Sequence, residues 1–385
     1  MNILVHDYAG HPFQVQLSRE LAGRGHQVTH GWFAEDQGPK GKLVKSPGDP
    51  EGLTFKPFGT GLSYSKTNFL RRRAGDIAYG RSCASWIEQN KPDVVISGNT
   101  PTEAQEFIQK SARASRTHFV YWCQDFFSLA ASKLLSKRFP IIGGAVGAYY
   151  RFLEKRQMRS ADYIVHITDG FLAQTDRWGI SRDKVTVIPN WGALDEIPLL
   201  GRETNWAKKH ELRRQSRVIY SGTLALKHNP KMLEALAAAE PERTDVLVVG
   251  FGTGADSLRG YDHLSNLKVL PVQSMDEFPE VLASADVLAA VIEAEAGEYS
   301  VPSKVLSYLC AGRPIVLAAP HENLAAQIIT ESGAGIVVSP DDTTEFVRAT
   351  QYFLDNKNAA SSAGLAGRRY AENHFTISKI ADRFE

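Results

Sequence analysis

Short apolar runs separated by amphipathic stretches recur along the chain from its first residues. Residues 3–5 (Ile-Leu-Val) form the first run, a loop containing Gly10 follows, and Val15, Leu17 and Leu21 give one apolar face of a helix. Short runs that are apolar throughout are typical of parallel strands buried on both faces. The pattern predicts a βαβ opening and hence a doubly wound parallel sheet.

The same alternation occurs twice along the chain. In the first half, further strands are expected at residues 27–29, 94–96, 118–121, 163–165 and 185–188. A second series is expected at residues 217–220, 246–249, 267–270, 287–289, 315–317 and 335–338, with a helix at 231–239. We therefore predict an α/β protein with two Rossmann-like domains facing across a cleft. The first domain is expected at 1–195, a hinge or linker at 196–216, and the second domain at 217–370. A helix at 371–385 could return to the first domain.

Composition places the chain among ordinary globular proteins. Its 385 residues are 43% hydrophobic and 23% charged, which excludes a disordered chain. The formal net charge of +1 argues against a nucleic-acid binder, but it hides an asymmetry. Residues 1–195 carry 25 Lys+Arg and 18 Asp+Glu, a net charge of +7, whereas residues 196–385 carry 19 and 25, a net charge of −6. The two halves are expected to meet different partners.

Cysteine spacing and hydropathy bear on the cellular compartment. Cys83, Cys123 and Cys310 are odd in number and far apart, which indicates neither a disulfide framework nor a CxxC metal or redox site. The N-terminus has no apolar segment of signal-peptide length. The most apolar run, residues 139–150, is too short to span a bilayer. We expect a cytoplasmic protein that can lie on a membrane without crossing it.

Residues 299–316 are the most informative stretch. They are predicted to form a loop, a helix that begins at Pro302 and Ser303, a C-terminal Gly312, and then a strand. A helix N-terminus facing a cleft suits a diphosphate, because its free N–H groups and dipole attract anions. Ser303 is expected to cap this helix and Lys304 to add positive charge. An ordinary αβ unit of the sheet is the alternative.

Residues 300–314 resemble the donor-site signature of family 4 retaining glycosyltransferases of the GT-B fold. The variant is Ser-x-Pro-Ser-Lys-x-x-x-Tyr-Leu-Ala-x-Gly-Arg-Pro, found in enzymes that build bacterial O-antigen, capsule and colanic-acid-type polysaccharide. Segments that resemble the family in order and spacing span nearly the whole chain: 11–28, 188–191, 220–223 and 270–286. The resemblance implies transfer of a sugar, of hexosyl type, from a nucleoside-diphosphate donor to a saccharide acceptor with retention of configuration.

The resemblance also implies which residues bind the donor. The expected donor-binding residues are Gly222, Thr223, Gly250, Phe251, Val272, Val301, Pro302, Ser303, Lys304 and Ser307. Lys227 matches the family lysine that reaches the donor phosphates, so we expect it to stabilise the departing diphosphate.

The chain departs from the family at its acidic pair. Family members commonly carry two glutamates eight positions apart, and here Tyr299 and Ser307 stand in their places. Glu298 or Glu295 is the candidate replacement for the first glutamate, which contacts the transferred sugar in the family. A solvated acidic loop is the alternative.

On the acceptor side, the resemblance implies contacts from Gly10, His11, Gln124 and Asn190, with Asp125 orienting the acceptor hydroxyl. Gln124 stands where family members often have a histidine, so a general base is not indicated there. By analogy with the family, the acceptor attacks from the front face and the departing phosphate receives its proton. We expect no cofactor beyond the nucleotide sugar, and no metal.

Other interpretations and partners remain open. Residues 250–255 match G-x-G-x-x-G/A, but the loop of the first strand lacks this fingerprint, which argues against a dinucleotide site. A nucleotide-sugar 2-epimerase of the GT-B fold and a degenerate, non-catalytic glycan-binding protein are the alternative functions. Basic, apolar-rich residues 66–81 and 133–159 suit peripheral contact with anionic lipid on the inner face of the plasma membrane, and a solvated helix face is the alternative. Such contact would suit an acceptor linked to polyprenyl diphosphate.

Overall fold

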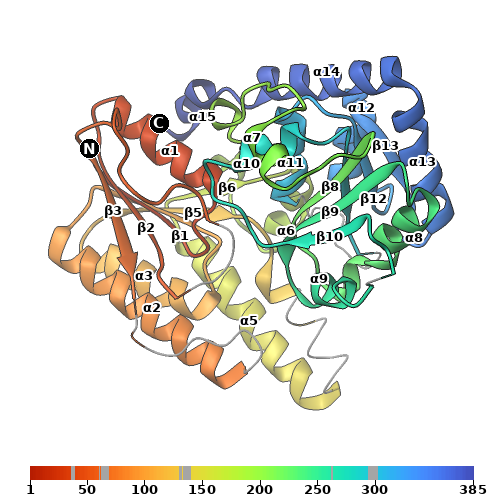
Figure 1. The fold of residues 1–385 in the computed structure, drawn as a ribbon. Helices are drawn as coiled ribbons and strands as arrows, with labels where there is room; N and C mark the ends of the chain where they lie inside the picture. Colours follow the sequence, from red (N-terminus) through yellow and green to blue (C-terminus); the bar gives the residue numbers. More distant parts are fainter. Residues whose placement is uncertain are drawn as a thin grey trace. The chain divides into compact units, whose positions relative to one another are not determined.

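The computed structural model describes residues 1–35, 40–59, 61, 69–129, 132, 140–261, 263–293 and 302–385. It divides into two compact units: unit 1 is Met1–Pro189 with Ile377–Glu385, and unit 2 is Asn190–Thr376. Each unit contains one parallel sheet flanked by helices (Figure 1). The predicted α/β architecture of two doubly wound sheets is confirmed.

Unit 1 has a seven-stranded sheet in the order β3-β2-β1-β4-β5-β6-β7. The strands are β1 (Asn2–Asp7), β2 (Gln27–Phe33), β3 (Leu53–Phe58), β4 (Val94–Gly98), β5 (His118–Cys123), β6 (Tyr163–His166) and β7 (Val185–Val187). In Figure 1, one face carries α1 (Pro12–Gly23) and α15 (Ile377–Phe384), and the other carries α2 (Phe69–Asn90), α3 (Thr102–Ala114) and α5 (Pro140–Ser160). The short helix α6 (Leu172–Arg177) follows β6. Because helices cover both faces, Leu4 and Val5 in central β1 are completely buried.

The C-terminal helix α15 is part of unit 1, where it packs on α1. The Arg24 guanidinium donates to Asp382 at 2.7 Å and to Glu385 at 2.6 Å, and the ring of Phe384 lies 4.9 Å from that of Trp122. The preceding helix ends at His374, so the segment that joins unit 1 begins at Ile377.

Unit 2 has a six-stranded sheet in the order β10-β9-β8-β11-β12-β13. Its strands are β8 (Ser216–Thr223), β9 (Thr244–Phe251), β10 (Leu267–Leu270), β11 (Val287–Val291), β12 (Ile315–Ala318) and β13 (Gly335–Val338). Its helices are α7 (Asn205–Lys209), α8 (Lys231–Ala239), α9 (Thr253–Leu258), α10 (Phe278–Ala283), α11 (Ser303–Cys310), α12 (Leu324–Ser332), α13 (Thr343–Asp355) and α14 (Lys357–His374). Apolar residues of the strands pack with α8, α9 and α13 in one core cluster.

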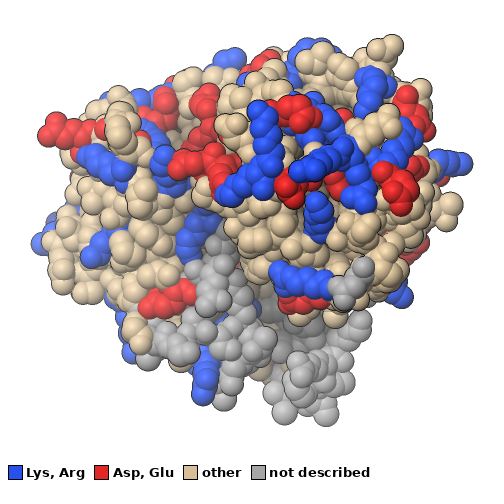
Figure 2. Space-filling model, viewed as in Figure 1, with Lys and Arg blue, Asp and Glu red and all other residues tan. Residues whose placement is uncertain are grey.

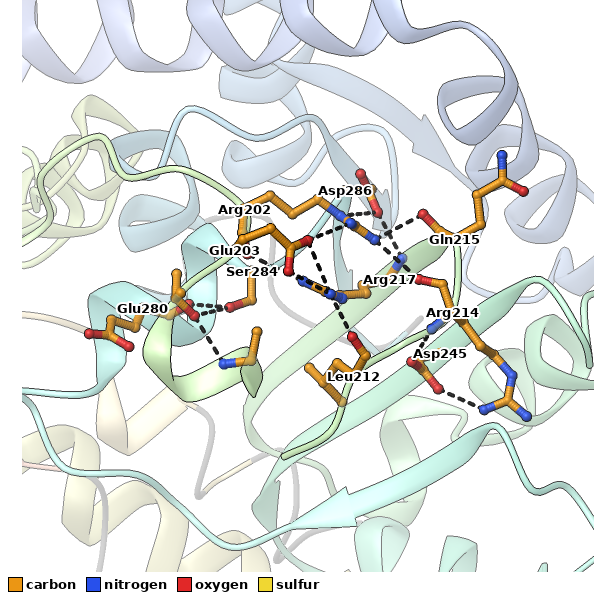
Figure 3. Close-up of polar contacts among 12 residues, drawn as sticks. Arg202, Glu203, Leu212, Arg214, Gln215, Arg217, Asp245, Glu280, Ser284 and Asp286 are labelled. Carbon is orange, nitrogen blue, oxygen red and sulfur yellow. Dashed lines mark hydrogen bonds and ion pairs between the residues drawn. The ribbon is translucent and has the colours of Figure 1, made fainter. Parts of the chain in front are cut away.

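Residues 196–216, expected to form a hinge, belong to unit 2 and pack on its sheet. Trp206 is 1% exposed, and the Arg202 guanidinium donates to Asp286 at 3.0 Å. Arg217, at the start of β8, donates to the Leu212 carbonyl at 2.6 Å and pairs with Glu203 at 3.2 Å (Figure 3). This network lies at the amino ends of the strands and fixes the segment to the sheet, so the boundary between the units falls earlier, after Pro189.

Acidic and basic side chains are intermixed on the face of unit 2 seen in Figure 2. Many of the unit's charges form ion pairs, among them Lys209 with Glu277, Arg243 with Asp355, and Arg368 with Glu372. Each pair uses one charge of either sign, so the net charge of −6 on residues 196–385 is unchanged by the pairing.

Candidate functional site

The carboxyl ends of β8 and β11 mark the natural binding position of unit 2. β8 lies between β9 and β11, and the chain progresses outward in both directions from this pair. In open parallel sheets, ligands bind outside the carboxyl ends of the strands at such a switch point. Residues that follow Thr223 and Val291 are thus placed to form a site.

Gly222 and Gly250 bring two backbones close together at this edge. They are paired across β8 and β9, and a Cβ on Gly250 would lie 1.9 Å from the Gly222 carbonyl oxygen. Gly222 has φ +107°, a conformation that residues with a Cβ rarely adopt. The next residues, Thr223 and Phe251, end the two strands. Glycine at both positions means that neither strand places a side chain of its own at this point of the edge, and the side chain nearest to Gly222 is that of Lys304.

Lys304, on the first turn of α11, reaches back to the end of β8. Its Nζ lies 3.7 Å from the centroid of the Tyr220 ring and 3.3 Å from the Thr223 carbonyl oxygen. Burial lowers the pKa of this lysine to about 7. An anionic ligand at this position would favour the charged form of Lys304.

Lys227 lies on the same edge, in the short 3-10 helix formed by residues 226–228 after β8. Its Nζ is 2.6 Å from Oε1 of Glu293, two residues beyond the end of β11. Burial, together with the charges of Lys304 and Lys227, lowers the pKa of the adjacent His228. The lowered pKa makes His228 a weak source of positive charge, which at this edge comes from Lys227 and from the protonated form of Lys304.

The N-terminus of α11 differs in one detail from the expectation. Pro302 is the N-cap residue, Ser303 is the first helical residue, and no side chain caps the helix. The expectation that Ser303 caps the helix is wrong, because Pro302 takes the N-cap position and Ser303 therefore already has helical backbone. The Ser307 hydroxyl donates to the Ser303 carbonyl oxygen at 3.3 Å. Of the first-turn N–H groups, that of Val305 donates to the Pro302 carbonyl oxygen at 3.0 Å. Those of Ser303 and Lys304 have no preceding helical carbonyl to donate to and suit an anion.

Of the remaining residues expected to contact the donor, one lies at the surface and two lie outside the described part of the chain. Val272, just after β10, is 46% exposed. Glu298 and Val301 lie outside the described residues. The structure thus brings together, at one sheet edge, Gly222, Thr223, Lys227, Gly250 and Lys304.

A pocket of about 210 Å³ lies at the carboxyl ends of β1, β4 and β5 in unit 1, beside the switch point between β1 and β4. Polar and apolar surfaces contribute about equally to its walls, which include the expected residues Gln124 and Asp125. Partial loss of hydration raises the pKa of Asp125, whose carboxylate accepts from the Phe126 N–H at 2.7 Å. Its other lining residues are Tyr8, Arg72, Asn99, Thr100, Pro101, Gln105, Tyr121, Trp122, Cys123, Phe127 and Glu154.

Two further carboxyl groups were not indicated by any sequence motif: Glu154, which lines this pocket, and Asp76, which is hydrogen-bonded to the lining residue Tyr8. Glu154 of α5 is 1% exposed and accepts from the Ser128 hydroxyl at 2.6 Å, and burial raises its pKa to about 7. Asp76 of α2 accepts from the Tyr8 hydroxyl at 2.5 Å, and burial raises its pKa to about 6. The pocket therefore presents carboxyl groups and amides to a ligand rich in hydroxyl groups.

The other expected acceptor residues lie apart from the lining of this pocket. His11 precedes α1, and its Nδ1 is 2.8 Å from the buried carboxylate of Asp7. Burial alone would raise the pKa of Asp7, but His11 holds it below its usual value. Gly10, with φ +74°, turns the chain between these two residues. Asn190 is the first residue of unit 2, unlike the other three expected acceptor residues.

The described part of the chain contains neither a cluster of metal ligands nor a membrane-spanning helix. Among those residues, no group of three or more His, Cys, Asp or Glu side chains is placed to hold a metal ion. None of the helices described is both long enough and apolar enough to cross a bilayer.

Comparisons with known proteins agree with the fold of two α/β units. A family model of the glycosyl transferase 4-like domain matches residues 11–191, and one of glycosyl transferases group 1 matches residues 215–356. Together the two models span most of the chain. A search of curated proteins gives no match to this sequence.

Solved structures similar to this chain include sucrose-phosphate synthase from Thermosynechococcus elongatus, with 14% identity, TM-score 0.72, and coverage of 99% of this chain and 96% of that one. Anabaena HepE in complex with UDP-glucose has 15% identity, TM-score 0.70, and coverage of 99% and 97%. WaaG, a glycosyltransferase of lipopolysaccharide biosynthesis, has 15% identity, TM-score 0.67, and coverage of 99% and 98%. At these identities the likeness shows a shared fold.

Proposed function

Because this chain belongs to the family 4 glycosyltransferases of the GT-B fold, we propose that it is a retaining enzyme that transfers a hexosyl group from a nucleoside-diphosphate sugar to a saccharide acceptor. The acceptor would be lipid-linked, and the product would belong to bacterial surface polysaccharide. The observation that carries the proposal is the convergence of Lys227, Lys304 and the N-terminus of α11 at the switch point of unit 2.

The donor diphosphate would lie against this cationic edge. Two lysines and the free N–H groups of a helix N-terminus match a diphosphate in charge and in hydrogen-bond donors. Lys227 and Lys304 would stabilise the negative charge that grows on the departing diphosphate, with no metal ion required. Anabaena HepE, which shares the fold, is described in complex with UDP-glucose, which makes uridine nucleotides the first donors to test.

The acceptor sugar would lie in the pocket of unit 1. Gln124 and Asp125 line this pocket and offer hydrogen-bond partners to sugar hydroxyls. Asp125 would orient the attacking hydroxyl. In front-face attack, the departing phosphate would receive the proton of the attacking hydroxyl.

Contact with a membrane would bring the enzyme to a lipid-linked acceptor. Helix α5 exposes Tyr149 and Phe152, which are 51% and 62% exposed, and the adjacent Arg156 guanidinium lies 5.7 Å from the Phe152 ring centroid. Aromatic side chains next to basic ones suit an anionic lipid surface. We place the protein in the cytoplasm, peripheral to the inner face of the plasma membrane. Co-sedimentation with vesicles containing phosphatidylglycerol, but not with pure phosphatidylcholine vesicles, tests this placement.

A screen of UDP-, GDP- and dTDP-sugars for hydrolysis and transfer, with and without EDTA, tests the proposed reaction. We expect transfer with at least one donor, undiminished by EDTA, and a product that retains the anomeric configuration. Release of an epimerised sugar without any acceptor would instead identify a 2-epimerase. Absence of both turnover and binding for every nucleotide sugar would leave only the non-catalytic alternative.

A further inference from the structure

Lys227 is held by a carboxylate in the structure. Its Nζ lies 2.6 Å from Oε1 of Glu293. Lys227 follows β8 and Glu293 follows β11, so the pair connects the two strands that define the switch point. The Glu293 carboxylate is thus paired with the lysine that we propose binds the donor diphosphate.

The ion pair is exposed enough to exchange. The Lys227 side chain is 59% exposed and that of Glu293 is 29% exposed. Ion pairs in contact with solvent contribute little net stability. A diphosphate carries more charge than one carboxylate and offers several acceptor oxygens, so it competes well for the lysine. Lys304, the second cation of the edge, contacts the Thr223 carbonyl and the Tyr220 ring instead of a carboxylate.

We propose that Glu293 is an exchangeable counter-ion of the donor diphosphate. It holds Lys227 while the site is empty, releases it to the diphosphate of an arriving nucleotide, and pairs with it again as the nucleoside diphosphate leaves. This inference rests on the function proposed above. Glu293 is a positioning residue, which weakens nucleotide binding and speeds product release.

Calorimetric titration of the full chain with UDP, GDP and dTDP tests the inference. Glu293→Gln should lower the Kd of the bound nucleotide about threefold to tenfold and slow its dissociation by a similar factor. The gain should vanish in Lys227→Ala/Glu293→Gln compared with Lys227→Ala alone. Asp355→Asn is the matched control, because Asp355 forms an ion pair of the same length, 2.6 Å, with Arg243 at the amino-end edge of the same sheet. It should leave the Kd unchanged.

The possible results separate this inference from the proposed function. If the wild type binds nucleotide, and Glu293→Gln leaves the Kd unchanged or raises it, the counter-ion role is overturned while the donor site stands. A gain that persists without Lys227 also overturns it. If the wild type binds none of the three nucleotides, both the donor site and the counter-ion role fail. Circular dichroism confirms that each variant is folded.

Discussion

Gly222 and Gly250 stand opposite one another on β8 and β9, so close that a Cβ on Gly250 would lie 1.9 Å from the Gly222 carbonyl oxygen. Gly250→Ala must therefore push the strand ends apart. We expect a loss of about 2 kcal/mol or more in the free energy of unfolding. Urea denaturation measures it.

Gly201→Ala is the control for this substitution, because no atom lies within 4 Å of the added methyl group. Its unfolding free energy should change by less than about 0.5 kcal/mol. Equal stability of the two variants would show that the close approach of Gly250 to Gly222 does not constrain this edge.

Lys227→Ala tests the proposed role of this lysine in the reaction. Removing a cation that stabilises the departing diphosphate should lower turnover about a hundredfold or more while the protein stays folded. Lys231→Ala, at an exposed position at the start of α8, is the control and should retain turnover. Near-normal turnover of Lys227→Ala would remove this residue from the mechanism.

Lys304 should make donor binding depend on pH. Because its pKa is lowered to about 7, the lysine gains its charge as the pH falls from 9 towards 6.5. The diphosphate of a nucleotide sugar stays fully ionised over this range, and His228, whose pKa is lowered, gains its proton at lower pH than Lys304 does. The affinity for a UDP-sugar should therefore rise about tenfold or more as the pH falls.

Substitutions of Lys304 isolate this effect. Lys304→Arg keeps a permanent charge and should flatten the pH profile, whereas Lys304→Met should bind weakly at every pH. The measurement is the Kd by calorimetry at pH 6.5, 7.5 and 9. A wild-type profile that Lys304→Arg does not change would contradict the assignment.

The sequence predicted the buried strands well, because a parallel strand covered on both faces needs an apolar run. The helix expected at 231–239 is α8, and the first-half strands are also present. The strand β3 was not predicted, since residues 53–58 contain Lys56 and Pro57 and have no long apolar run. β3 lies at the sheet edge, where a proline costs no ladder hydrogen bond on its free side.

The site was predictable only where one segment carried a motif. Lys304 and Gly222 were found because each lies in a recognisable stretch of sequence. Glu293 is 66 positions from Lys227, and only the order of β8 and β11 in the sheet brings the two together. Glu154 likewise reaches the pocket from α5, where its neighbours along the chain are ordinary helix residues. Contacts of this kind depend on topology and have no local signature.

Arg217 should contribute strongly to the stability of unit 2. Its guanidinium is 3% exposed and donates to the carbonyls of Leu212 and Arg202. Arg217→Met would remove the donor to the Leu212 carbonyl and one of two donors to the Arg202 carbonyl, which keeps the Thr204 N–H, so we expect a loss of about 2–4 kcal/mol in unfolding free energy. Arg213→Met is the control, because the Arg213 side chain is 82% exposed. This substitution should change the unfolding free energy by less than about 0.5 kcal/mol. Similar urea midpoints for both variants would show that the network in Figure 3 contributes little to the stability of unit 2.

Glu154 should lower the stability of the protein as the pH rises. Burial raises its pKa from 4.5 to about 7, so the folded protein binds the proton more tightly than the unfolded chain does. The carboxyl group therefore contributes most favourably below pH 4.5, and this contribution is lost as the pH rises to about 7. Glu154→Gln keeps an acceptor for the Ser128 hydroxyl but cannot ionise.

The variant should thus gain stability relative to the wild type between pH 4.5 and 7, by up to about 3 kcal/mol, and the difference should be constant at higher pH. Unfolding free energies from urea titrations at pH 4.5, 6 and 7.5 measure this trend. Glu88→Gln, at an exposed position on α2, is the control and should show no such trend. A difference between Glu154→Gln and the wild type that stays the same at all three pH values would mean that Glu154 does not change its protonation when the protein folds.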